Sequence, residues 1–208
     1  MSKKTILFLT STRADFSKLK SLILRLQKNK NFCINIFVTG MHLLKNYGFT
    51  VNELYRSNIK NIFKFKNQSE KNYSMTKSLS LTISGLTKHL KKNKTDLIII
   101  HGDRMEALAG AIVGIFNNIH VGHIEGGEIT GTIDESIRHS VSKLSHFHFV
   151  SNEDSKKRLI QMGENKNTIF IIGSPDLDIM KKKGLPNIQA AKKFYGIKYD
   201  NYSIMIFH

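Results

Sequence analysis

The sequence predicts an α/β fold with a Rossmann-like parallel sheet that carries helices on both faces. Three observations support this fold class. Short and almost continuously apolar segments recur along the chain, helix-length amphipathic segments separate most of them, and clusters of polar residues follow several of them directly. Strands that are apolar throughout are typical of parallel sheets buried on both faces. Because 40% of the 208 residues are hydrophobic, the chain has enough apolar material for a sizeable core.

Seven segments are predicted to be strands. They are Ile6–Leu9, Ile34–Val38, Ile62–Phe65, Leu97–Ile100, Val121–Ile124, Phe147–Val150 and Ile169–Ile172. Between them, a first helix is expected over Phe16–Gln27, where leucines and an isoleucine recur at helical spacing, and a later one over Glu106–Phe116. Ligands of parallel sheets bind beyond the carboxyl ends of the strands, so the residues that follow each strand are the candidates for a site.

The sequence changes character after Ile172. Gly173-Ser174-Pro175 interrupts the pattern, helical segments follow, and Ser203–Phe207 is predicted to be a further strand just before His208. We therefore expect a Rossmann-like domain over residues 1–173. Residues 174–208 are expected to form a linker and the start of a second, nucleotide-binding domain whose remainder is missing from the sequence.

Composition argues against several classes of partner. The formal net charge is +16, but the lysines are spread along the chain and no aromatic residues interleave with a basic run, so we do not expect nucleic-acid binding. No apolar run approaches the ~20 residues that a membrane helix needs. The first residues do not resemble a secretory signal, and we expect a cytoplasmic protein.

The loop after the first strand is a candidate anion site. It runs from Thr10 to Ser17 and leads into a helix, whose N-terminal N–H groups attract anions. The guanidinium group of Arg13 can hold a phosphate bidentately. Asp15 or Ser17 could equally serve only as helix caps. The loop lacks the glycine fingerprints of known phosphate loops, so alone it indicates phosphate binding weakly.

A compact polar turn, His101-Gly102-Asp103-Arg104, follows the fourth strand. Gly102 allows a sharp turn or the close approach of a ligand. Asp103 is a candidate catalytic group. It could instead cap the helix that begins near Glu106, with Arg104 paired to it.

The fifth strand leads into the most acidic polar segment of the chain. Glu125 and Glu128 flank paired glycines, and we interpret them as carboxylates on a flexible turn over a cleft. Asp134 and Glu135 begin a helix, where acidic residues also suit the helix dipole. Carboxylates close to one another raise each other's pKa, which suits acid–base catalysis. The nearby histidines lack the spacing of a structural zinc site, so no metal is predicted.

Together these motifs resemble the hydrolysing UDP-N-acetylglucosamine 2-epimerases of bacterial sialic-acid pathways. The matching segments are Arg13–Leu19, Thr39–His42, His101–Arg104, His123–Glu128, Gly131–Glu135, Arg138-His139 and Gly173–Pro175. The resemblance covers nearly the whole chain, in order. It implies the N-terminal half of a two-domain fold like that of the B-type glycosyltransferases, with the active site between the domains.

The resemblance also implies roles for individual residues. Contacts to the UDP-sugar are implied for Arg13, Ser17, His42, Arg104 and His208, and catalytic roles for Asp103, Glu125, Asp134 and Glu135. Glu135 matches an acidic position that non-hydrolysing relatives use. The implied reaction removes the C2 proton, eliminates UDP and adds water to give N-acetylmannosamine. It implies no cofactor and a homo-oligomer.

Two other interpretations of the same residues stay open. One is a nucleotide-sugar glycosyltransferase, because this architecture hosts both activities. The other is a fragment that binds nucleotide weakly or not at all and does not catalyse. The acidic residues from Glu125 to Asp134 favour proton chemistry at the sugar.

Overall fold

The computed structural model describes residues 3–71, 74–181 and 184–205. In these ranges seven strands form one parallel sheet in the order β3-β2-β1-β4-β5-β6-β7. Their bounds are β1 Lys4–Thr10, β2 Phe32–Val38, β3 Ile62–Lys64, β4 Leu97–His101, β5 His120–Ile124, β6 Phe147–Val150 and β7 Ile169–Ile171. All seven strands predicted from the apolar segments are therefore confirmed, with ends that differ by at most two residues.

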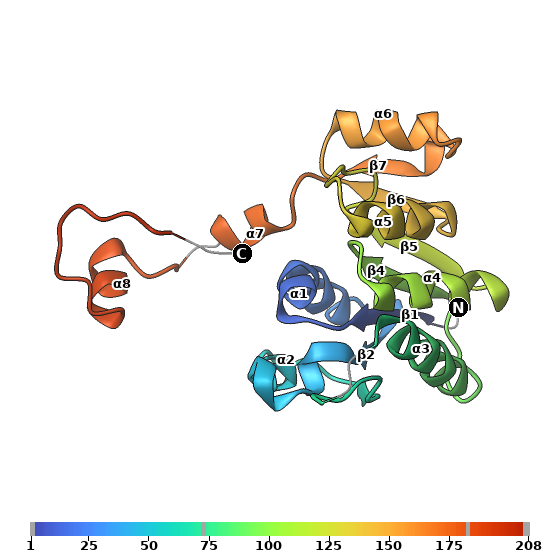
Figure 1. The fold of residues 1–208 in the computed structure, drawn as a ribbon, viewed down its shortest axis with the longest axis horizontal. Coiled ribbons are helices and arrows are strands. Elements are labelled where there is room, and N and C mark those ends of the chain that lie inside the picture. The colour runs from blue at the N-terminus through green and yellow to red at the C-terminus, as the bar shows by residue number, and fades with distance from the viewer. Residues whose placement is uncertain (1–2, 72–73, 182–183, 206–208) are drawn as a thin grey trace.

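Helices connect the strands and lie on both faces of the sheet (Figure 1). They are α1 Arg13–Gln27, α2 Val51–Arg56, α3 Met75–Leu90, α4 Met105–Phe116, α5 Ile133–Lys143, α6 Glu153–Gln161, α7 Asp176–Met180 and α8 Ile188–Phe194. Within the described ranges, three 3₁₀ helices lie in the connections: η1 Gly40–Leu43, η2 Lys45–Tyr47 and η3 Lys166–Thr168. The two helices expected over Phe16–Gln27 and Glu106–Phe116 are confirmed as α1 and α4.

The sheet is buried on both faces because alternate side chains of each strand point to opposite sides. In β1, Ile6 and Phe8 pack with α1 and α2, whereas Leu7 and Leu9 pack with α3 and α4 on the other face. Both clusters consist of residues with almost no solvent exposure. This two-sided burial explains why the strands are apolar throughout, and it confirms the predicted fold class.

The order of the strands reverses between β1 and β4. From β1 the chain proceeds outward to β2 and β3, and after α3 it returns to β4 on the other side of β1. The loops that leave β1 and β4 therefore lead in opposite directions along the sheet. The carboxyl ends of these two strands border a topological switch point. Ligands of open α/β sheets bind at such points.

The segment beyond β7 lies partly outside the sheet domain. In Figure 1, α7 lies near α1 and α8 lies well apart from the sheet. Ser21 of α1 donates a hydrogen bond of 3.4 Å to Asp178 of α7. The expected strand over Ser203–Phe207 is wrong for Ser203–Met205, which are not in a strand, and its last two residues lie outside the described ranges. The second domain stays a prediction.

None of the helices in the described part of the chain is both long enough and apolar enough to cross a membrane.

Candidate functional site

The loop after β1 forms the N-terminal cap of α1, and Arg13 is exposed beside it. Thr12 is the N-cap of α1, and the Asp15 side chain completes a capping box with it. The Asp15 carboxylate accepts hydrogen bonds from Ser11 N at 3.0 Å, Thr12 N at 3.1 Å and the hydroxyl of Thr10. Asp15 therefore serves the helix cap, one of the two alternatives. Arg13 is exposed at the first position of α1.

Two predicted substrate-binding residues near this loop are engaged within the protein. The hydroxyl of Ser17 donates a 2.8 Å hydrogen bond to the Ala14 carbonyl. His42 has no exposed surface, and its ring nitrogens lie 3.0 Å from Thr10 Oγ1 and 2.7 Å from Thr50 Oγ1. Burial lowers the pKa of His42. In this geometry His42 supports the loop from inside, so contact with a ligand stays a prediction.

The turn after β4 directs Asp103 toward α5. Arg138 is 5% exposed, and its Nη2 donates to Asp103 while its Nη1 donates to the Glu128 carbonyl at 2.9 Å. The N-cap of α4 is Arg104 and not Asp103, and no side-chain hydrogen bond caps this helix. The alternative that Asp103 only caps α4 is therefore wrong, because its carboxylate pairs with Arg138.

Arg104 lies beside a buried carboxylate. Its Nε is 3.1 Å from Glu106 Oε2, and Glu106 is only 1% exposed. The other Glu106 oxygen accepts a 3.4 Å hydrogen bond from Asn67 of the β3–α3 loop. The Arg104 side chain is 30% exposed. The buried Glu106 carboxylate therefore holds it while part of its surface stays open to solvent.

Glu125 is held by two side chains from other elements of the fold. Lys18 of α1 donates to both of its carboxylate oxygens at 2.8 Å, and His101 Nε2 lies 3.0 Å from Oε2. Burial alone would raise the pKa of Glu125, but His101 and Lys18 outweigh it and lower the pKa to about 2. Glu125 is therefore ionised at neutral pH.

The backbone around Glu125 is tightly packed. Glu125 itself has a φ of +64°, in the left-handed region that disfavours side chains. A Cβ added at Gly127, whose φ is +79°, would lie 2.5 Å from the Ser155 carbonyl oxygen, and one at Gly126 would lie 2.8 Å from Ser142 Oγ. The interpretation of these glycines as a flexible turn is wrong, since they are required by close packing and by backbone conformation.

The start of α5 presents the other two predicted carboxylates near the surface. Asp134 is exposed, next to the N-cap Thr132. Glu135 Oε2 accepts hydrogen bonds of 2.8 Å from the backbone N–H groups of Thr130 and Gly131. These two hydrogen bonds lower the pKa of Glu135. Glu135 thus ties down the outer loop Ile129–Thr132 that precedes its own helix.

The structure brings Asp103 and Glu125 together in two adjoining turns, His101–Arg104 and Glu125–Glu128, which we call the paired turns. His101 and Arg138 each join one turn to the other, and Lys18 joins them to α1. Asp134 and Glu135 lie outside this cluster, on the helix that supplies Arg138. His208 lies outside the described residues.

Three residues of this arrangement were not singled out by the sequence. Lys18, His101 and Arg138 supply the positive or hydrogen-bonding partners of Asp103 and Glu125. Lys18 and Arg138 had only their place within the matching motifs, and His101 only its place in the polar turn after the fourth strand. In the described ranges, no group of three His, Cys, Asp or Glu side chains is arranged to hold a metal ion.

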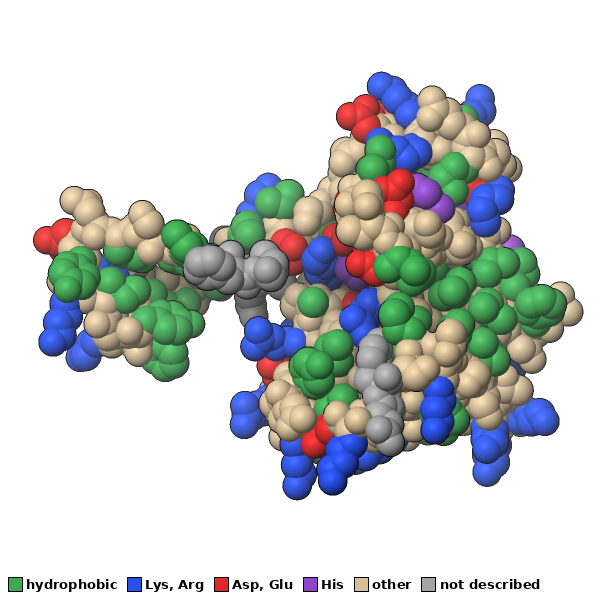
Figure 2. Space-filling model, in the orientation of Figure 1, with side chains coloured by type: hydrophobic (Ala, Val, Ile, Leu, Met, Phe, Trp, Pro, Cys, Tyr) green, Lys and Arg blue, Asp and Glu red, His purple; other side chains and the backbone are tan. Residues whose placement is uncertain are grey.

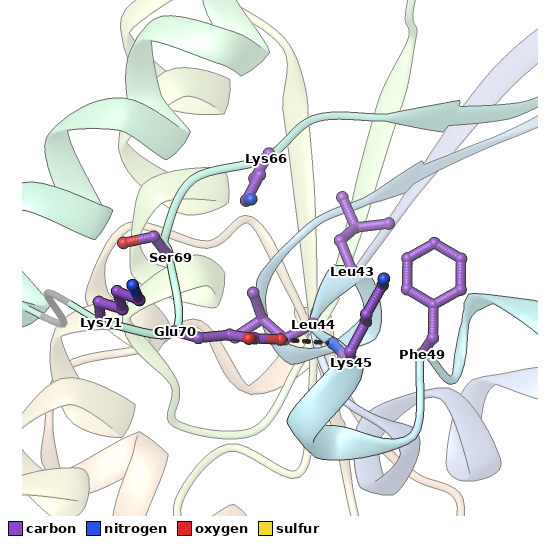
Figure 3. Close-up of a pocket in the computed structure, with 8 residues that line it drawn as sticks. All are labelled: Leu43, Leu44, Lys45, Phe49, Lys66, Ser69, Glu70 and Lys71. Atoms are coloured by element: carbon purple, nitrogen blue, oxygen red, sulfur yellow. Dashed lines mark hydrogen bonds between the residues drawn. The ribbon is translucent and has the colours of Figure 1, made fainter.

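A separate hollow of about 580 Å³ lies beside the ends of β2 and β3 (Figure 3). Its lining is Leu43, Leu44, Lys45, Phe49, Lys66, Ser69, Glu70 and Lys71. The Glu70 carboxylate accepts a 2.8 Å hydrogen bond from the Lys45 backbone. None of the predicted site residues lines this hollow, and the candidate catalytic groups lie at the paired turns instead.

Comparison with known proteins finds relatives over nearly the whole chain. The family model described as UDP-N-acetylglucosamine 2-epimerase matches residues 24–208. A UDP-N-acetylglucosamine 2-epimerase of Neisseria meningitidis serogroup B is 47% identical over 205 residues, which are 99% of this chain and 54% of that protein. A UDP-N,N'-diacetylbacillosamine 2-epimerase (hydrolyzing) of Legionella pneumophila is 38% identical over 99% of this chain and 55% of its own length.

Solved structures agree on the fold. The UDP-GlcNAc 2-epimerase of Neisseria meningitidis bound to UDP-GlcNAc superposes with a TM-score of 0.76 at 27% identity, over 91% of this chain and 52% of that one. A Listeria monocytogenes structure gives a TM-score of 0.79 at 21% identity. These proteins have the GT-B-like architecture, which confirms the predicted fold, and this chain spans about half the length of the curated relatives it matches. The chain belongs to the UDP-N-acetylglucosamine 2-epimerase family.

Proposed function

We propose that the full-length protein containing this chain is a hydrolysing 2-epimerase. It would convert UDP-N-acetylglucosamine, or a related UDP-2-acetamido sugar, and water into UDP and N-acetylmannosamine. The observation that carries the proposal is the ionised Glu125, held between Lys18 and His101 beside the Asp103–Arg138 pair at the switch point of the sheet. Family membership adds support.

Cations are proposed to bind the departing nucleotide. Arg13 is exposed at the N-terminus of α1, and Arg104 keeps part of its surface open at the neighbouring turn. Both guanidinium groups can pair bidentately with phosphate oxygens. They would stabilise the negative charge that develops on UDP as the anomeric C–O bond breaks. Ser17, His42 and His208 would support this side of the site.

The carboxylates are proposed to act on the sugar ring. Because its pKa is about 2, Glu125 is ionised and can accept the C2 proton but cannot donate one. Such a weak base is sufficient only if positive charge builds at C1 during cleavage of the C–O bond, which makes the C2 proton more acidic. Asp103 and Asp134 would handle the proton and water of the second step, while Glu135 holds the outer loop.

The hydrolysing branch is the finer part of the proposal. Two relatives with 38% and 37% identity are described as hydrolyzing, and one with 34% identity is described as a polysialic acid biosynthesis protein. Incubation of the full-length protein with UDP-N-acetylglucosamine alone in D₂O tests it. We expect UDP and free N-acetylmannosamine with deuterium at C2. Recovery of UDP-N-acetylmannosamine would instead assign the non-hydrolysing reaction.

The same incubation separates the two alternatives. A glycosyltransferase would release UDP at a useful rate only after an acceptor sugar is added. A non-catalytic fragment would release none, and its melting temperature would not rise with UDP.

We propose that the protein self-associates through the outer side of α4. Leu108, Ile112, Ile115 and Phe116 follow one another at helical spacing, with 37% and 81% exposure for the last two. Figure 2 shows hydrophobic side chains gathered over this helix. Glu106, the one charged residue of α4, is buried. The formal net charge of the chain is +16, so two copies repel each other electrostatically. An uncharged face is therefore the most favourable place for a second copy to bind.

Light scattering of the full-length protein tests the assembly. Phe116→Asp should lower the measured mass to that of the monomer. Ile160→Asp, at a residue of α6 that is 42% exposed, is the control and should leave the mass unchanged. A monomeric unsubstituted protein, or an oligomer that tolerates Phe116→Asp, would contradict the proposal.

A further inference from the structure

His123 is a buried histidine beneath the paired turns that the proposed reaction does not use. Its side chain has no exposed surface, and both ring nitrogens have partners. Nε2 lies 2.8 Å from the Gly102 carbonyl oxygen, and Nδ1 lies 3.0 Å from Ser142 Oγ. Because a carbonyl can only accept, the ring proton is on Nε2, and Nδ1 accepts from the Ser142 hydroxyl.

Gly102 is the residue that decides where Asp103 lies. Its φ of +74° turns the chain in the left-handed region, although a Cβ there would meet no atom within 4 Å. Its N–H donates to the Ile124 carbonyl at 3.0 Å, and its own carbonyl accepts from His123. Two consecutive residues of β5 therefore hold both backbone groups of Gly102, which fixes the direction in which the chain continues to Asp103.

Helix α5 closes this arrangement. Ser142 and Arg138 are four residues apart and lie on the same side of the helix. Ser142 donates to His123, while Arg138 donates to Asp103. The contacts thus run from α5 through the His123 ring and Gly102 to Asp103, and return to α5 through Arg138. If the His123 ring were displaced, the Gly102 backbone would move while Arg138 still held the Asp103 carboxylate.

We propose that His123 is a positioning residue for Asp103, acting through the Gly102 carbonyl as a neutral ring protonated on Nε2. The proposal rests on the proposed function, because it assigns Asp103 a role on the substrate. The ring packs closely against Gly126, where a Cβ would lie 2.9 Å from Nδ1. Burial lowers the pKa of His123 to about 3, so the ring stays neutral at neutral pH.

Substitutions that separate hydrogen bonding from packing test this role in the full-length protein. The amide nitrogen of His123→Gln can approach the place of Nε2, whereas His123→Leu removes the donor. His148 supplies the matched control, because it is equally buried in β6 but pairs with Glu164 at 3.1 Å. His148→Gln and His148→Leu should lower stability without touching the Gly102 carbonyl.

We expect His123→Leu to lower kcat for UDP release on the order of 10²-fold with little change in KM, because a displacement of about 1 Å costs that much. The kcat of His123→Gln should be at least about ten-fold higher than that of His123→Leu. The His148 variants should keep the original kcat even where their melting temperatures fall as far. A kcat for His123→Leu equal to that of His148→Leu, or no rescue by glutamine, would overturn the proposal.

A spectroscopic measurement on this chain complements the kinetics. Two-bond ¹H–¹⁵N correlation spectra should show the ring of His123 neutral, with its proton on Nε2, from about pH 5 to 8. A proton on Nδ1, or a charged ring, would overturn the inference. If the unsubstituted full-length protein released no UDP, the proposed function would fail while this measurement still decided the state of His123.

Discussion

Glu125 and Glu135 come from one acidic segment, but the fold gives them opposite surroundings. Glu125 is 13% exposed and is held by side chains of α1 and β4, far away in the sequence. Glu135 accepts hydrogen bonds from the backbone of the loop directly before it. Both carboxylates have a lowered pKa, yet for different causes. We infer that long-range cationic partners favour a role of Glu125 on the substrate, whereas local backbone donors favour a structural role of Glu135.

The rate of the reaction should separate the two glutamates most strongly. Glu125→Gln removes the proposed proton acceptor and should lower kcat for UDP release on the order of 10² to 10⁴-fold. Glu135→Gln keeps an acceptor for the loop and should cost less than about ten-fold. Steady-state kinetics on the full-length protein measure both. Equal losses would contradict the distinction, and a larger loss for Glu135→Gln would favour the non-hydrolysing chemistry.

The second largest difference is expected in the stability lost when a glycine of each region is replaced by alanine. Gly127→Ala combines a φ of +79° with a 2.5 Å approach to the Ser155 carbonyl oxygen, and should destabilise the chain by about 2–5 kcal/mol. Gly131→Ala, at a φ of +68° in open space, meets only the backbone cost of about 1–2 kcal/mol. Urea unfolding of this chain compares them. Similar losses would show that the paired turns are not tightly packed.

The pH dependence of stability should follow Glu125. Its pKa falls from 4.5 to about 2 on folding, so the ionised form stabilises the fold above pH 4.5, and this stabilisation is lost as the pH falls toward 2. The full contribution is roughly 3 kcal/mol. The difference in free energy of unfolding between the unsubstituted chain and Glu125→Gln should therefore shrink from pH 6 to pH 3. A constant difference would contradict the depressed pKa.

The pairing of Lys18 with Glu125 should be measurable by itself. A double-mutant cycle with Lys18→Met and Glu125→Gln should give a coupling energy of about 1–3 kcal/mol, because the pair is mostly shielded from solvent. The corresponding cycle for Glu135 and His139, 3.8 Å apart and more exposed, should give no measurable coupling. Reversed values would remove the distinction between the two regions.

The fold was predictable because strands that are buried on both faces of a sheet have almost continuously apolar sequences. Each of the seven apolar segments predicted to be strands became a strand of one parallel sheet. The expected strand from Ser203 was wrong over its described residues, although its sequence is as apolar as that of the others. A short apolar segment forms a strand only beside a pairing partner, and the described residues around it supply none.

The site was predictable as far as strand ends indicate it. Asp103 and Glu125 were chosen as candidate catalytic residues because they follow β4 and β5. Their partners could not be inferred, since Lys18 lies 107 residues from Glu125 in the sequence and meets it only through the order of the strands. The position of His42 was also hidden, because its burial depends on the Thr50 side chain just before α2. Motifs supply residue types, and the topology decides which of them meet.

Glu125 stays ionised because Lys18 and His101 hold it. The most direct measurement is the pH titration of its carboxyl carbon by ¹³C NMR in this chain, with the signal assigned from Glu125→Gln. We expect an apparent pKa of about 2, with no change of the signal between pH 7 and about pH 4. A titration centred near or above the ordinary glutamate value of 4.5 would contradict it.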